Sequence, residues 1–188
     1  MSDEPATTQA ENQPAAIASA PAPRFIMLHG SITEESASST IKQLLELNIK
    51  DPKQPIVMTL SSFGGDALEA FALYDVIKSI NTPVHIVGLG KIMSAGTLIL
   101  SAGEKGQRKI GKHTSLMIHQ VAGGAYGNIL DIESRLYEIK RIQKQAEEIY
   151  LKETKLSAKE ITKIMEEKTE KFYTAEEAVK MGFADIII

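Results

Sequence analysis

The sequence contains no cysteine among its 188 residues. A disulfide scaffold, a cysteine-ligated zinc site and thiol catalysis are therefore all excluded. It also lacks a strong excess of charge, because the net charge is −3 and no block of basic residues occurs. Nucleic acid and anionic membrane surfaces are consequently poor candidate partners. The longest apolar runs are strand-sized, far short of the roughly 20 residues that span a bilayer, so we expect no membrane contact and a cytoplasmic protein.

Motifs that bind phosphates or metals are missing as well. The phosphate-binding patterns GxGxxG and GxxxxGK followed by Ser or Thr do not occur, and Gly88–Lys91 lacks their spacing. The HExxH pattern of zinc proteases is also absent. We therefore expect neither a cofactor nor a metal ion to take part in the function.

The composition that remains is that of a globular domain with a distinct N-terminal segment. Apolar residues make up 43% and charged residues 24% of the chain, an ordinary balance. Residues 1–24 differ from the rest, with seven Ala and four of the seven Pro, and they lack the apolar stretch of a signal peptide. We predict a disordered Ala/Pro-rich tail over 1–24 and one folded domain over 25–188.

Strand and helix patterns alternate throughout residues 25–188. Short apolar runs predict strands at 25–29, 56–60, 83–89, 115–118 and 184–188. Capping residues followed by apolar positions at helical spacing predict helices that begin near residues 33, 66, 93, 130, 157 and 174. The helix that begins near 130 continues to about 155. Strands separated by helices predict an α/β domain with a mainly parallel sheet.

Ser94 and the Gly64-Gly65 pair are candidates for a site at the carboxyl ends of strands. Ser94 stands where a helix should begin, so free backbone N–H groups and the helix dipole would stabilise an oxyanion there. It can equally be an ordinary N-cap serine. Ile92 excludes the nucleophile elbow of α/β-hydrolases, which needs glycine at that position. The glycine pair either brings backbone N–H groups close to an oxygen or simply forms a tight turn.

His119 is the best candidate base among the four histidines. It closes the predicted strand at 115–118, and a neutral imidazole is suited to accepting a serine proton at neutral pH. The alternative is a hydrogen-bonded core histidine. His29, which also ends a strand, is the second candidate, whereas His85 lies within a strand and His113 within a turn.

A carboxylate that orients the base is the least determined part of the pattern. Glu166, Glu167 and Glu170 are all candidates, and spacing does not choose among them. Charged stretches of this kind are more often a solvated surface.

Taken together, five segments resemble the ClpP-type proteolytic subunits of the Clp protease, over about Arg24 to Ile188. They are Ser-Ser-Phe-Gly-Gly at 61–65, Met-Ser-Ala-Gly at 93–96, Met-Ile-His-Gln at 117–120, Gly-Gly-Ala-Tyr-Gly at 123–127 and Thr-Ala-Glu-Glu-Ala at 174–178. The order and spacing of five segments are far more specific than any one of them.

The resemblance implies a serine peptidase with Ser94 as nucleophile and His119 as general base. By the same match, the N–H groups of Gly65 and Ala95 form the oxyanion hole, and Glu170 takes the place of the triad Asp. The family fold is a right-handed spiral of ββα units, shared with crotonases. Its protruding handle helix, here about 130–155, interlocks two seven-membered rings. An AAA+ unfoldase feeds unfolded protein into the chamber of these rings.

The sequence also departs from the family pattern. Glu170 replaces Asp, Phe63 and Val121 replace prolines, and Ala95 replaces Met. About two residues are inserted near 154–159, and the family's N-terminal gate segment is not recognisable.

Three functions are therefore compared. The first is a serine endopeptidase that works as a heptameric or tetradecameric ring. The second, motivated by Glu170, is a non-catalytic ring subunit that pairs with an active homologue. The third is a crotonase-type acyl-CoA enzyme, in which Gly64-Gly65 would be the important feature.

Overall fold

The structure, a computed structural model, describes residues 24–167 and 169–188. Its helices are α1 (Glu34–Lys50), α2 (Ala67–Ser79), α3 (Ala95–Ala102), α4 (Ile129–Glu153), α5 (Ala158–Glu166) and α6 (Ala175–Met181). Its strands are β1 (Phe25–Ile32), β2 (Ile56–Gly65), β3 (Val84–Met93), β4 (Lys109–Ile110), β5 (Ser115–Ile118), β6 (Lys171–Tyr173) and β7 (Ile186–Ile187). The predicted α/β class is confirmed.

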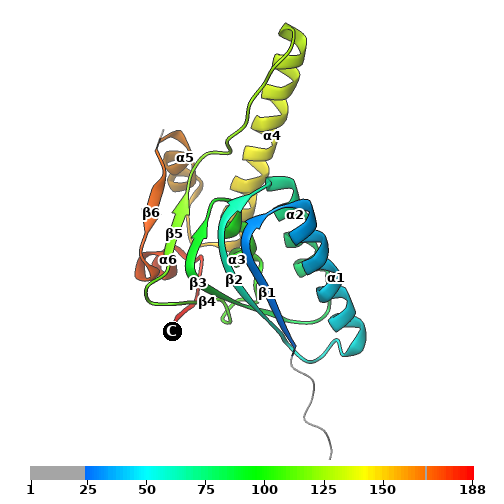
Figure 1. The fold of residues 1–188 in the computed structure, drawn as a ribbon. Coiled ribbons are helices and arrows are strands. Elements are labelled where there is room, and N and C mark those ends of the chain that lie inside the picture. The colour runs from blue at the N-terminus through cyan, green and yellow to red at the C-terminus, as the bar shows by residue number, and fades with distance from the viewer. Residues whose placement is uncertain (1–23, 168) are drawn as a thin grey trace, which may run out of the picture.

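A mainly parallel sheet organises the molecule (Figure 1). Its strand order is β1-β2-β3-β4-β7, and β3 also pairs with β5 farther along its length. The pairing of β5 with β6 is antiparallel, whereas the others are parallel. The predicted parallel sheet is therefore confirmed, and α4 protrudes from the body as the expected handle helix.

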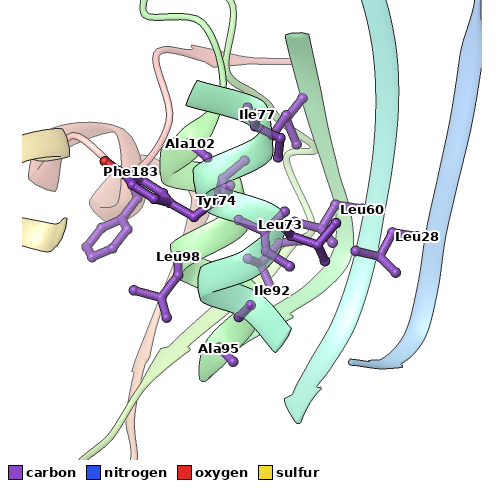
Figure 2. Close-up of a cluster of buried hydrophobic side chains, with 14 of the residues drawn as sticks. Leu28, Leu60, Leu73, Tyr74, Ile77, Ile92, Ala95, Leu98, Ala102 and Phe183 are labelled. Atoms are coloured by element: carbon purple, nitrogen blue, oxygen red, sulfur yellow. The ribbon is translucent and has the colours of Figure 1, made fainter. Parts of the chain in front are cut away.

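The hydrophobic core lies between one face of the sheet and helices α1–α3. Figure 2 shows Leu28, Leu60 and Ile92 on neighbouring strands and Leu73 of α2 pointing toward them, whereas the buried Leu98 points to the other side of α3. Burying each such side chain stabilises the fold by about 1.5–3 kcal/mol relative to exposure. This packing fixes the carboxyl ends of β2 and β3 relative to the N-terminus of α3.

The opposite face of the sheet is open near its β1 edge. Along β1, Ile26 and Leu28 are buried, whereas Phe25 and Met27 are about two-thirds exposed. This alternation is typical of a strand with only one face covered.

Three strands are longer than predicted: β1 continues past His29 to Ile32, and β2 and β3 extend further still. The sequence pattern ended β2 and β3 at Leu60 and Leu89, because Ser, Gly and Lys follow each apolar run. In the structure β2 continues to Gly65, through a shift of register that pairs Ile32 with Gly65, and β3 continues to Met93. The extra length carries both strands to the site described below.

Two short strands, β4 and β6, were not predicted. They have two and three residues, too few for an alternating pattern to stand out. In addition, the predicted strand at 184–188 is ordered as a strand only at Ile186–Ile187.

The predicted tail falls almost entirely outside the described residues. Only Arg24 is described, and its Nη2 donates hydrogen bonds to the carbonyl oxygens of Leu47 and Asp51, at 3.0 and 2.9 Å. The tail therefore remains a prediction. Within 24–167 and 169–188, the helices are all too short or too polar to cross a bilayer.

Candidate active site

Ser94 joins the end of β3 to the start of α3 in an unusual backbone conformation. Its φ of 51° makes it the one non-glycine residue with positive φ in the described chain. Such a conformation costs of order 1–3 kcal/mol and persists only where the surroundings enforce it. Here the Ser94 N–H donates to the carbonyl of Met117 on β5, at 2.8 Å. The turn is thus held by the neighbouring strand.

The Ser94 side chain does not cap the helix that it precedes. The other helices of the described chain begin with a side-chain capping bond, made by Thr33, Asp66, Asn128, Ser157 and Thr174. Ser94 makes none, and its Oγ lies 2.7 Å from Nε2 of His119. The ordinary N-cap interpretation therefore does not describe this serine.

His119 reaches Ser94 because β5 pairs with β3. The register aligns Met93 with Met117, so Ser94, one residue farther along, and His119, two residues farther along, lie beyond the same end of the paired strands. His119 is half-buried, and if its Nδ1 carries the proton, Nε2 is free to accept one from Ser94. The second candidate base, His29, was predicted to end its strand but lies exposed within β1, where it pairs with Ser61 of β2.

The glycine pair at the end of β2 lies against the Ser94 turn. A Cβ on Gly64 would come 2.7 Å from Ser94 Cβ and 2.8 Å from the Met93 carbonyl oxygen. A Cβ on Gly65 would collide with the carbonyl oxygen of Ile32. Both glycines also have positive φ. Close backbone approach therefore requires glycine at both positions.

A cleft of about 430 Å³ runs between these strand ends and α4. Four of the sequence-predicted residues line it together: Gly65, Ser94, Ala95 and His119. Ala95 is the first residue of α3, so its N–H has no acceptor within the helix. The α4 wall is partly apolar and includes Ile139, Ile142 and Ala146, and Leu98 of α3 adds a further apolar side chain to the lining. Such a cleft can hold an extended chain beside a nucleophile, a base and backbone donors.

The three candidate acids differ in their position relative to His119. β6 pairs Lys171 with Ile118, and extending that antiparallel register by one residue sets Glu170 opposite His119. Glu170 is nevertheless exposed, and in the described part of the chain no hydrogen bond joins His119 to a carboxylate. Glu167 forms an ion pair with Lys171 instead, and Glu166 is exposed.

Sequence reasoning missed two hydroxyl groups beneath the Ser94 turn. Thr97 Oγ1 donates to the Ser94 carbonyl oxygen at 2.6 Å, and Tyr150 Oη lies 2.7 Å from Thr97 Oγ1. Burial raises the pKa of Tyr150 to about 12. Thr97 was detectable in principle, because a Thr three residues after a helix-start serine often bonds back to it. Tyr150 was not, since 53 residues separate it from Thr97.

Gln143 was missed as well. Its Oε1 accepts a hydrogen bond from the Val121 N–H at 2.7 Å, which fastens the segment after His119 to α4. Among residues 24–167 and 169–188, no group of three or more His, Asp and Glu side chains could hold a metal ion.

A comparison with known protein families matches most of the chain. The chain matches the protein-family model described as Clp protease over residues 9–188, far more than half of its length. The matched span contains every residue that lines the cleft.

Proposed function

The chain belongs to the Clp protease family, and from that premise we propose that it is a serine endopeptidase with Ser94 as nucleophile and His119 as general base. The 2.7 Å contact between Ser94 Oγ and His119 Nε2 carries the proposal. It is supported by the strained backbone of Ser94 and by the missing capping bond, because both leave the hydroxyl free for the cleft.

The reaction proceeds through an acyl-enzyme. Ser94 Oγ attacks the carbonyl carbon of the scissile peptide bond while its proton passes to His119 Nε2. The N–H groups of Gly65 and Ala95 stabilise the negative oxygen that forms. The protonated His119 then donates its proton to the leaving amine nitrogen, and the C–N bond breaks. Water, deprotonated by His119, hydrolyses the ester and restores Ser94.

Glu170 is the carboxylate that we assign to the orientation of His119. The strand register places its backbone opposite His119, whereas Glu167 is engaged with Lys171. The glutamate side chain turns inward from its exposed position to accept the Nδ1–H bond, which fixes the tautomer that leaves Nε2 as the acceptor.

Self-association into the heptameric or double ring of the family forms the second part of the proposal. The segment before α4 and the outer half of that helix expose large apolar side chains: Tyr126, Ile129, Leu130, Leu136 and Tyr137. A patch of this kind favours burial against another subunit. In such a ring the cleft faces a closed chamber, and an AAA+ unfoldase supplies the unfolded substrate.

A non-catalytic ring subunit is the second candidate. One observation favours it: His119 has no carboxylate partner in the described residues. The two candidates differ in whether Ser94 is chemically activated.

Intact mass after treatment with a fluorophosphonate separates them. The sample is first shown to be oligomeric by sedimentation velocity, since a monomer at micromolar concentration would contradict the ring. We expect one adduct per subunit in the wild type and none in Ser94→Ala, whose peptidase kcat should fall by ~10⁶. An oligomeric wild type without an adduct would instead support the non-catalytic subunit.

A further inference from the structure

We propose that Thr97 and Tyr150 are positioning residues that aim the backbone N–H of Ala95 at the oxyanion. This role rests on the proposed serine peptidase function. The two residues form a hydrogen-bonded chain under the Ser94 turn, from Tyr150 Oη to Thr97 Oγ1 and on to the Ser94 carbonyl oxygen.

The direction of this chain follows from the number of hydrogens. The Ser94 carbonyl can only accept, so the single hydroxyl hydrogen of Thr97 points toward it. Tyr150 must therefore donate its own hydrogen to Thr97 Oγ1. Both side chains are buried, and the Tyr150 phenol is protonated at neutral pH, as an ordinary tyrosine is. Burial raises its pKa further, to about 12.

Peptide planarity connects this chain to the reaction. The carbonyl of Ser94 and the N–H of Ala95 belong to one rigid, planar peptide unit and point in opposite directions. Holding the carbonyl oxygen from below therefore fixes the direction in which the Ala95 N–H points. The Thr97 N–H adds a second bond to the same oxygen, at 2.9 Å. The peptide unit at the oxyanion site thus cannot rotate without losing both bonds.

Tyr150 is itself held in place at the buried base of α4. Its ring meets Phe183 edge to face, with centroids 5.4 Å apart and planes at 69°. The phenol therefore donates its hydrogen bond to Thr97 from a fixed position in the core. Because an oxyanion forms only in the transition state, loss of this alignment should lower kcat and leave KM nearly unchanged.

The test uses isosteric changes in the assembled protein. Thr97→Val removes the hydroxyl and keeps the shape, Thr97→Ser keeps the hydroxyl, and Tyr150→Phe removes only the phenol oxygen. Ser101→Ala is the matched control, since Ser101 is equally buried in α3 and its Oγ bonds the Thr97 carbonyl at 2.8 Å rather than Ser94. Fluorophosphonate labelling rate, kcat and KM on a short fluorogenic peptide, and melting temperature are measured for each.

We expect Thr97→Val to lose roughly 10- to 100-fold in labelling rate and in kcat, with little change in KM. Tyr150→Phe should lose roughly 3- to 10-fold, and Thr97→Ser should recover most of the rate. Because Tyr150 acts through Thr97, the double variant should be no slower than Thr97→Val. Ser101→Ala should be labelled at the wild-type rate even if it melts earlier.

The outcomes separate this inference from the proposed function. A labelled wild type with equally fast Thr97→Val and Tyr150→Phe would overturn the positioning role and leave the peptidase intact. An equal slowing in Ser101→Ala would also overturn it, because general destabilisation would then explain the loss. If Thr97→Val fails to fold, the comparison of Tyr150→Phe with Ser101→Ala decides. An unlabelled wild type would remove the proposed function and this inference together.

Discussion

The two sides of the His119 ring lie in regions that are built very differently. On the Nε2 side, Ser94 sits at the end of a central strand, between two strand ends and a buried helix, with a strained backbone and a close glycine contact. On the other side, Glu170 precedes a three-residue strand at the edge of the sheet and is exposed. One side is fixed by the packing of the chain itself, and the other is free to rearrange.

This difference shows which part of the site is held rigidly by its surroundings. Three neighbours constrain the nucleophile turn: Gly64 packs against it, and Met117 and Thr97 form hydrogen bonds with the backbone of Ser94. The edge strand β6 pairs only with β5, so the segment that carries Glu170 has a single neighbouring strand. Regions with few buried contacts open at low cost in free energy. Orientation of the base is therefore the adjustable part of the site.

Gly64→Ala should disrupt the Nε2 side of the site, where Ser94 lies, more than any other variant below. Its Cβ would collide with Ser94 Cβ and the Met93 carbonyl, so the nucleophile turn must shift. A shift of about 1 Å costs ~10²-fold in rate, and we expect at least that loss in fluorophosphonate labelling. Gly106→Ala is the control, because Gly106 has a similar positive φ but open space around it.

The control carries only the backbone strain. Gly106→Ala should lose about 1–2 kcal/mol of unfolding free energy from the positive φ, measured by chemical denaturation. Gly64→Ala should lose more, because the collision adds to the same strain. Only Gly64→Ala should lose labelling. Equal labelling rates in the two variants would show that close packing at Gly64 does not hold Ser94 in place.

Glu170→Gln tests the adjustable side, where a smaller effect is expected. Loss of the orienting carboxylate of a complete triad costs ~10⁴ in kcat, but an exposed Glu170 should contribute less, roughly 10- to 100-fold. The measurement is kcat and KM on a fluorogenic peptide, with KM nearly unchanged. Glu167→Gln is the matched control, because it removes a carboxylate three residues away that pairs with Lys171.

A larger loss in Glu167→Gln than in Glu170→Gln would reverse the assignment. If neither variant slows the reaction, His119 works without an orienting carboxylate, and the assignment of Glu170 is wrong.

The contrast between the two sides also explains what the sequence could predict. Alternation of apolar runs and helical spacing predicted the parallel sheet, and the carboxyl ends of parallel strands meet at one edge. Ser94, His119 and the glycine pair were therefore expected to converge. Ser94, His119 and Gly65 line one cleft, and Gly64 packs against the Ser94 turn. The Ser94 side of the site could be predicted because it is built from strands and helices with a clear apolar periodicity.

The acid side could not be predicted for a physical reason. Lys171–Tyr173 is too short to show a period of two, and its antiparallel pairing with β5 depends on contacts distant in sequence. Without that strand there is no register, so spacing left the three glutamates equivalent, and only the family resemblance favoured Glu170. The contact between Thr97 and Tyr150 was missed for a similar reason, because only tertiary packing brings α3 and α4 together.

A substitution far from the His119 ring should lower the free energy of unfolding and leave the labelling rate of Ser94 unaltered. Asp185 accepts two hydrogen bonds from the side chain of Arg108, at 2.9 and 2.6 Å, near the β4–β7 end of the sheet. Burial alone would raise the pKa of Asp185, but the bonds from Arg108 and from the Gly106 N–H outweigh it and hold this pKa below its usual range.

The direction of the pH effect follows from that lowered pKa. The folded protein binds this proton more weakly than the unfolded chain, so the ion pair adds stability above the ordinary Asp pKa of about 4. The contribution disappears as pH falls through the lower, folded pKa. Asp185→Asn should therefore destabilise the protein most near neutral pH and progressively less in acid.

The size of this loss is set by the arginine that remains. Arg108 is buried, and removing its partner should cost about 3–5 kcal/mol, or roughly 10 °C in melting temperature at pH 7. Glu46→Gln, which removes an exposed ion pair with Lys42, should change stability by about 0.5 kcal/mol or less. Labelling of Ser94 should stay within about twofold of wild type in both variants below their melting temperatures. A labelling rate that fell with stability in Asp185→Asn would show that the nucleophile turn depends on the whole sheet rather than on its own close contacts.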